Sequence, residues 1–97
     1  MLTLTAPAVE AIRTLTTAPG VAEKSGLRIW HSDHSGSLGL TVVAEPESGD
    51  QVLETEGIRV FLQSEAALML RDKAMDAWED ESGFAFQIVV PDRILLD

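Results

Sequence analysis

The chain has 97 residues, of which 45% are hydrophobic and 24% are charged, and it contains no cysteine. This composition is typical of one globular domain, while the missing thiols exclude disulfides and any cysteine-ligated zinc or iron–sulfur site built from this chain alone. Seven basic residues against sixteen acidic ones give a net charge of −9, which excludes nucleic acid and anionic membrane surfaces as partners.

No apolar run approaches the roughly 18 residues that a membrane-spanning helix needs. The first residues also lack a basic region followed by an apolar stretch, which is the pattern of a secretory signal. We therefore expect a cytoplasmic protein.

The chain is expected to begin with a short strand, Leu2–Leu4, followed by a helix. Thr5 has the side chain of an N-cap, Pro7 suits the first helical turn, and the helix should end near Ala18, before the turn residues Pro19 and Gly20. Its apolar stripe has helical spacing and consists of Val9, Ile12 and Leu15.

From residue 26 onward the period changes to that of strands, with β-branched and aromatic residues enriched. The expected strands are Gly26–Trp30, Leu38–Ala44, Gln51–Thr55, Ile58–Leu62, Met75–Asp80 and Phe84–Val90. A second, short helix is expected at Glu65–Leu70, capped by Ser64. The sequence thus predicts an α+β fold, with mostly antiparallel or mixed sheets, an N-terminal helix and a short second helix.

The expected core follows from these elements and their periodicity. It comprises Val9, Ile12, Leu27, Ile29, Leu40, Val42, Val60, Leu62, Leu68, Phe84 and Phe86.

The segment between the first two long strands, residues 31–37, concentrates the chemically active side chains. His31, Asp33 and His34 are candidate metal ligands, because imidazole and carboxylate both bind iron or zinc. They can converge only through a tight turn, since alternate residues of an extended chain face opposite sides. The alternative is a polar loop in which the imidazoles cap backbone groups or face solvent. A serine-based catalytic triad is disfavoured, because its members would be neighbours in one loop, and the protein is not expected to be an enzyme.

Several short stretches together carry a resemblance to a known family. Ser35-Gly36, preceded by His34, is similar to a Cys-Ser-Gly ligand loop with histidine in place of the thiolate. Other stretches follow in the matching order: Met1–Ile12, Gly26–Ile29, Gly57–Phe61, Met75–Asp80 and Ser82–Phe86. The chain therefore resembles the HesB-like domain of A-type iron–sulfur cluster carriers.

The resemblance implies a HesB-like domain over residues 1–90 and a tail, residues 91–97, in place of the family's Cys-Gly-Cys segment. Family members pool cysteines, usually across a homodimer, to hold a cluster. Because this chain has none, we expect a degenerate member that holds no cluster or other cofactor, forms a homo-oligomer, and binds proteins of iron–sulfur or iron metabolism. The alternative is a residual carrier of iron or another divalent metal that uses His31, Asp33 and His34.

Partner contacts are expected beside this loop and in the tail. The candidate residues are Trp30, Ser35, Gly36, Ile94, Leu95 and Leu96. Two acidic stretches, residues 45–56 and 76–81, are interpreted either as solvated edges or as a docking face for a basic partner.

Overall fold

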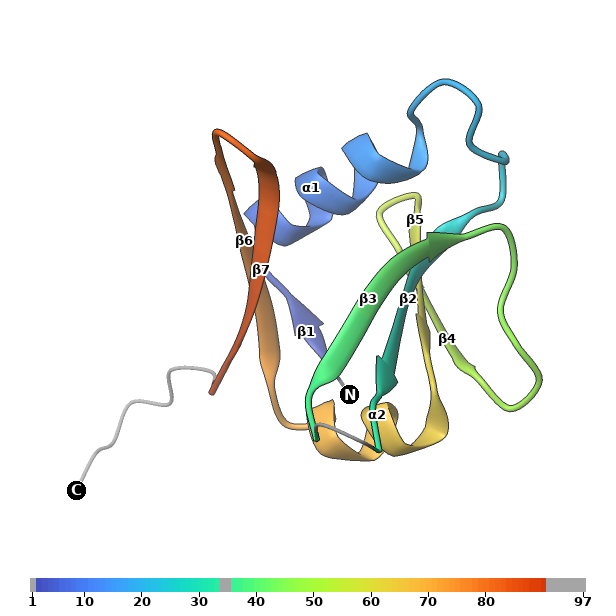
Figure 1. Cartoon of the computed structure of the whole chain (residues 1–97), viewed down its shortest axis with the longest axis vertical. Coiled ribbons are helices and arrows are strands. Elements are labelled where there is room, and N and C mark those ends of the chain that lie inside the picture. Colours follow the sequence, from blue (N-terminus) through green and yellow to red (C-terminus); the bar gives the residue numbers. More distant parts are fainter. Residues whose placement is uncertain (1, 34–35, 91–97) are drawn as a thin grey trace.

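The computed structural model describes residues 2–33 and 36–90 as nine elements (Figure 1). In chain order these are β1 (Thr3–Leu4), α1 (Ala6–Thr16), β2 (Gly26–His31), β3 (Leu38–Val43), β4 (Gln51–Thr55), β5 (Ile58–Leu62), α2 (Ser64–Leu70), β6 (Ala74–Asp80) and β7 (Gly83–Val89). The α+β class and the two helices are therefore confirmed. Neither helix in the described part of the chain is long and apolar enough to cross a membrane.

The strands form two sheets of mixed direction. The larger has the order β3-β2-β5-β4, with β2 parallel to β5 and the two outer pairs antiparallel. The smaller has the order β1-β6-β7, with β1 parallel to β6 and β6 antiparallel to β7. The parallel pairing of β2 with β5 places the carboxyl ends of both strands at one edge of the larger sheet, where α2 begins (Figure 1).

Helix α1 connects the cores of the two sheets. Its N-cap is Thr5, as the sequence predicts, and the Thr5 hydroxyl accepts a hydrogen bond from the Ala8 N–H at 3.3 Å. Val9 and Ile12 pack into the main core, whereas Ala8 and Ala11 form a second cluster with the smaller sheet. The helix ends at Thr16 rather than Ala18, and the Thr16 and Thr17 hydroxyls donate to carbonyls of its last turn.

Six of the predicted core residues are fully buried: Val9, Ile12, Leu27, Ile29, Val60 and Leu62. Val42, Phe84 and Phe86 are partly buried and pack against the core clusters. The core also includes side chains that the sequence analysis did not assign to it, among them Leu2, Ile58, Phe61 and Met75.

Two core predictions are wrong, for Leu40 and Leu68, which are 39% and 68% exposed. Leu68 lies on a helix of only seven residues whose buried side is formed by Ala66 and Leu70. A residue midway between positions i and i+4 faces the opposite side of a helix, so Leu68 points outward. Leu40 lies on the edge strand β3 and lines an apolar cavity of about 170 Å³ instead of packing solidly.

Candidate functional site

The carboxyl end of β2 is fastened to the beginning of α2 by Gln63. The Gln63 N–H donates to the Ile29 carbonyl at 3.0 Å, and the Gln63 side-chain oxygen accepts from the His31 N–H at 2.9 Å. Gln63 is also the N-cap of α2, so the prediction of Ser64 as N-cap is wrong. The helix therefore starts one residue earlier than predicted, at Ser64.

His31, Asp33 and Glu65 converge at this edge. Imidazole Nδ1 of His31 lies 3.7 Å from Oδ1 of Asp33 and 3.8 Å from Oε1 of Glu65. The three side chains offer ligand atoms that lie within 4.8 Å of one another. The His31 side chain is only 20% exposed, whereas Asp33 and Glu65 are 87% and 59% exposed. The site is thus a buried nitrogen faced by two solvated carboxylates.

His31 Nδ1 is itself buried and has no hydrogen-bond partner. A buried polar atom without a partner is uncommon in folded proteins, because its desolvation costs about 1–3 kcal/mol. Among the described side chains, Nδ1 of His31 is the only buried nitrogen or oxygen atom in this state. The polar atom thus lacks its partner at a point where two carboxylates converge.

A tight turn positions Asp33 beside the imidazole. The Ser32 N–H donates to the Ser37 carbonyl at 2.8 Å, and the Gly36 N–H donates to the Ser32 carbonyl at 2.8 Å. The tight turn that convergence of these side chains requires is therefore present. His34 and Ser35, two further candidates from the sequence, lie outside the described residues.

The structure brings Glu65 into the cluster, and the sequence analysis missed it. Glu65 is 34 positions from His31 along the chain, so no local motif links the two residues. A signal nevertheless existed: if β2 and β5 are parallel, their carboxyl ends meet at the same edge, and the residues that follow each strand become neighbours. That pairing had not been inferred from the sequence.

The predicted contact residues have different surroundings. The partly buried Trp30 pairs with Gly39 across β2 and β3, and its ring covers Gly39 so closely that a Cβ atom there would collide with it. Gly36 is exposed and has a positive φ of 69°. Ile94, Leu95 and Leu96 lie outside the described residues.

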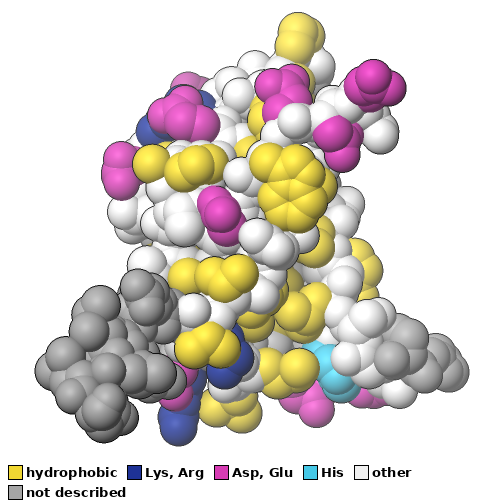
Figure 2. Space-filling view, turned by 90° about the vertical axis from the view of Figure 1, so that its left-hand side faces the viewer, with side chains coloured by type: hydrophobic (Ala, Val, Ile, Leu, Met, Phe, Trp, Pro, Cys, Tyr) yellow, Lys and Arg dark blue, Asp and Glu magenta, His cyan; other side chains and the backbone are white. Residues whose placement is uncertain are grey.

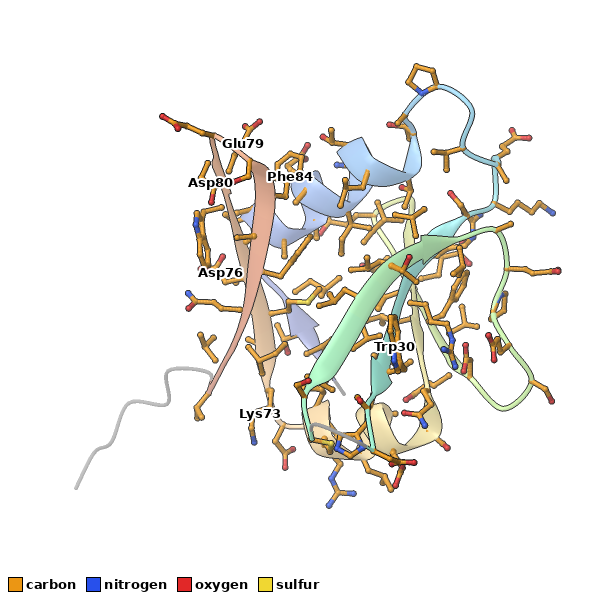
Figure 3. The ribbon with its side chains drawn as sticks, in the orientation of Figure 1. Trp30, Lys73, Asp76, Glu79, Asp80 and Phe84 are labelled. Carbon is orange, nitrogen blue, oxygen red and sulfur yellow. The ribbon has the colours of Figure 1, made fainter. Side chains whose placement is uncertain are left out.

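A groove between α1 and the smaller sheet forms a second candidate surface. Its volume is about 320 Å³, and its lining includes Trp78, Phe84, Glu10 and Glu79. Trp78 is 47% exposed, which makes it the more accessible of the two tryptophans. Glu79, Asp80 and Phe84 lie together at one end of β6 and β7 and far from Trp30 (Figure 3). On the face of the molecule that forms the left-hand side of Figure 1, hydrophobic side chains are interrupted by acidic ones (Figure 2).

Several acidic groups gather at the end of the smaller sheet. In the described part of the chain, no Lys or Arg forms an ion pair with Glu79, Asp80 or Glu81. Asp76, three residues before Glu79 on β6, has hydrogen-bond partners. A hydrogen bond from the Thr5 hydroxyl, at 2.7 Å, and a second from the Ala77 N–H lower the pKa of its carboxyl. Asp76 is thus a structural group, whereas Glu79, Asp80 and Glu81 are exposed, and Asp80 accepts a hydrogen bond from the Ser82 N–H at 2.8 Å.

The comparisons with known proteins support the expected fold. The sequence matches no protein-family model and no curated protein. Among solved structures, it is similar to IscA, crystallised with the [2Fe–2S] cluster, at 28% identity and a TM-score of 0.68, over 97% of this chain and 88% of that one.

Two further structures agree. Escherichia coli SufA, involved in biosynthesis of iron–sulfur clusters, is 25% identical with a TM-score of 0.74, over 95% of this chain and 87% of SufA. A protein from Aquifex aeolicus, solved by NMR, is 24% identical with a TM-score of 0.76, over 93% of this chain and 91% of that one. The chain therefore has the HesB/IscA-like fold, and it has that fold without a single cysteine.

Proposed function

We propose that this protein takes part in iron–sulfur cluster assembly as a non-catalytic protein-binding scaffold that holds no cluster itself. The observation that carries the proposal is the combination of an IscA-like fold over 97% of the chain with the absence of cysteine from all 97 residues. The fold connects the chain to cluster assembly, and the missing thiols remove the chemistry of carriage.

The remaining donor groups do not replace thiolates. A [2Fe–2S] cluster is bound by four cysteines, or by two cysteines and two histidines in Rieske centres. This chain offers two histidines and many carboxylates, and carboxylates are hard ligands that suit single hard ions better than sulfide clusters. A dimer of this chain would still contribute no thiolate.

The groove between α1 and the smaller sheet supports a role in protein binding. It combines an exposed aromatic side chain, Trp78, with the carboxylates of Glu10 and Glu79. Aromatic anchors dominate the binding energy of many interfaces, and complementary charge speeds encounter. With a net charge of −9, the expected partner presents a basic surface with an apolar centre. Trp30, Ser35 and Gly36 remain predicted contact residues.

The tail, residues 91–97, is proposed to dock near residues 31–37, on its own domain or on a neighbouring subunit. The apolar cavity between the two sheets is lined in part by Leu38 and Ile88, and Ile88 precedes Val90, where the described chain ends, by two residues. Ile94 is four residues further on, within a reach of roughly 13 Å for an extended chain, so Ile94, Leu95 and Leu96 are the expected occupants. Deletion of residues 92–97 should then increase binding of an apolar dye, and an unchanged signal would contradict the proposal.

Anaerobic reconstitution tests the first half of the proposed function. The purified protein is incubated with ferrous iron and sulfide, desalted and examined by visible spectroscopy, with SufA treated in parallel. We expect a colourless protein, whereas SufA should develop charge-transfer bands. Stable bands in this chain at a fixed stoichiometry would refute the cluster-free scaffold.

Capture from native lysate, with identification of the captured proteins, tests the second half. The wild-type protein is compared with Trp78→Ser, and Leu68→Ser serves as the matched control because Leu68 is also exposed but lies on α2. Proteins of iron–sulfur or iron metabolism should be retained by the wild type and by Leu68→Ser and lost with Trp78→Ser. A captured set without any such protein, or one that Trp78→Ser leaves unchanged, would contradict the proposal.

A further inference from the structure

We propose that His31, Asp33 and Glu65 form a binding site for a single divalent transition-metal ion of the Fe²⁺, Mn²⁺ or Zn²⁺ class. This inference goes beyond the scaffold function and needs neither sulfide nor a cluster. It rests on the buried, unpartnered Nδ1 of His31 and on the two carboxylates that face it from different elements.

The spacing of the three side chains suits a shared ion. Bonds from zinc to imidazole nitrogen are about 2.0–2.1 Å and to carboxylate oxygen about 2.0–2.2 Å, so two such ligands lie no more than roughly 4.3 Å apart. The observed separations of 3.7 Å and 3.8 Å between Nδ1 and the two carboxylates fall within that limit. The ligand atoms of Asp33 and Glu65 lie within 4.8 Å of each other, and because both side chains are largely solvated they can rotate to bring this third separation within the same limit.

A hydrogen bond from Nδ1 to either carboxylate fits these distances less well than a shared metal ion does. Hydrogen bonds from nitrogen to oxygen are about 2.7–3.2 Å long, and both carboxylates lie beyond that range from Nδ1. If the ring proton were on Nε2 instead, the Nδ1 lone pair would face two negative charges. A cation between the three groups removes this repulsion and supplies the missing partner of the buried nitrogen.

Hydrogen bonds position the backbone of the ligand residues before any ion arrives. Gln63 binds the His31 N–H and lies two residues before Glu65, so one residue positions both ligands. The hydrogen bonds between Ser32, Gly36 and Ser37 hold the turn that carries Asp33. Such orientation by surrounding hydrogen bonds is a general feature of protein metal sites.

The donor set indicates the class of ion. One imidazole and two carboxylates suit divalent iron, manganese and zinc, whereas monovalent copper prefers thiolates and thioethers, and magnesium and calcium prefer oxygen alone. Three protein ligands also leave coordination positions for water or for a donor from another molecule. The site is therefore expected to exchange its ion rather than to bury it.

Binding of the metal alone, measured by calorimetry, tests the site. Zn²⁺ is titrated in buffer without sulfide, Fe²⁺ is titrated anaerobically, and Mg²⁺ serves as the comparison ion. We expect one Zn²⁺ per chain and a loss of affinity of roughly tenfold or more in each of His31→Gln, Asp33→Asn and Glu65→Gln. Glu23→Gln, which removes an exposed carboxylate from the loop after α1, should bind like the wild type.

A spectroscopic measurement identifies the imidazole ligand directly, and an unfolding measurement controls for loss of the fold. In long-range ¹⁵N correlation spectra, Zn²⁺ should shift the Nδ1 resonance of His31. Urea unfolding without metal shows whether each variant is still folded, so that a lost affinity is not mistaken for a lost fold. His34→Gln should retain binding, because the proposed site does not use His34.

The outcomes separate this site from its alternatives. Absence of Zn²⁺ binding, or binding that His34→Gln abolishes and Glu65→Gln does not, would overturn the proposal. Zn²⁺ binding by a protein that stays colourless on reconstitution supports both the site and the scaffold function. Charge-transfer bands from a protein that binds no Zn²⁺ would refute both. A colourless protein that binds no Zn²⁺ would overturn the metal site alone, so the two proposals can fail independently.

Discussion

Two polar clusters lie on the same strand, β2. We call the first, Arg28 with Asp50, closed because its charged groups are hydrogen-bonded to each other, and the second, His31 with Asp33 and Glu65, open because its groups are not. On one face, Arg28 donates two hydrogen bonds to Asp50, at 2.8 Å and 3.0 Å, and the two side chains are only 14% and 2% exposed. On the other face, the nearest oxygens lie 3.7 Å and 3.8 Å from His31 Nδ1, beyond hydrogen-bonding distance. The first cluster satisfies its own charges, and the second leaves room for an ion.

The pKa values of the closed pair reflect its geometry. The hydrogen bond with the Arg28 guanidinium lowers the pKa of the Asp50 carboxyl, and the same bond raises the pKa of Arg28. Asp50 also accepts from the Glu47 N–H at 3.0 Å, so the pair fastens the β3–β4 connection to β2. The closed pair therefore stabilises the fold, whereas the open cluster is the proposed site for a metal ion.

The largest expected effect is the loss of the closed pair. Asp50→Asn removes the charge that Arg28 binds, and the free energy of unfolding should fall by about 1.5–3 kcal/mol. Asp33→Asn, which removes a carboxylate from the open cluster, should change it by less than about 0.5 kcal/mol without metal, because Asp33 is 87% exposed. Urea unfolding of the two variants measures both values, and equal losses would contradict the distinction between the clusters.

A second substitution tests the packing beside Arg28. Because adjacent residues of a strand alternate between faces, Trp30 shares the face of Arg28. Gly39→Ala places a methyl group against the Trp30 ring, and such overpacking costs about 1–3 kcal/mol. The half-buried ring can move outward, so the lower part of that range is expected. Trp30 emission, measured in a Trp78→Phe background, should shift to the red, and an unchanged spectrum would show that the ring does not lie over Gly39.

The dependence of stability on pH should follow the closed pair. A carboxyl whose pKa is lower in the folded protein stabilises the fold above its unfolded pKa, about 3.9 for aspartate, and loses that contribution as pH falls through the folded pKa. Asp50 and Asp76 both have lowered pKa values. Unfolding free energies measured from pH 5 to pH 2 should therefore decline, and the decline should be shallower in Asp50→Asn and shallowest in Asp50→Asn/Asp76→Asn. Parallel curves for all three proteins would contradict this account.

The smallest effect is expected at the open cluster in the absence of metal. Glu65→Gln should change the free energy of unfolding by no more than about 0.5 kcal/mol, because a solvated carboxylate contributes little. With saturating Zn²⁺ the difference from the wild type should widen, since bound metal stabilises only the protein that binds it. Thermal unfolding with Zn²⁺ and with chelator measures that difference, and equal shifts in both proteins would show that the ion binds elsewhere.

Local features of the fold were predictable from the sequence. Thr5 caps α1 because its hydroxyl accepts from an N–H three residues away, and Glu56-Gly57 joins β4 to β5 because both residues adopt positive φ angles of 49° and 81°. The bounds of β4 and β5 agree with the sequence prediction for the same reason. These features depend on neighbouring residues, whose chemistry is visible in the printed order.

Tertiary structure alone decided the two clusters on β2. Arg28 meets Asp50 across 22 positions and His31 meets Glu65 across 34, and in each case the contact depends on how strands pair and where the connecting segments pass. The exposure of Leu68 has the same origin, because a short helix buries only the side that the sheet covers. Composition and periodicity determined which elements form and that no thiolate is available. The parallel pairing of β2 with β5 brought Glu65 to His31, and the path of the β3–β4 connection brought Asp50 to Arg28. Both are long-range contacts that leave no local pattern in the sequence.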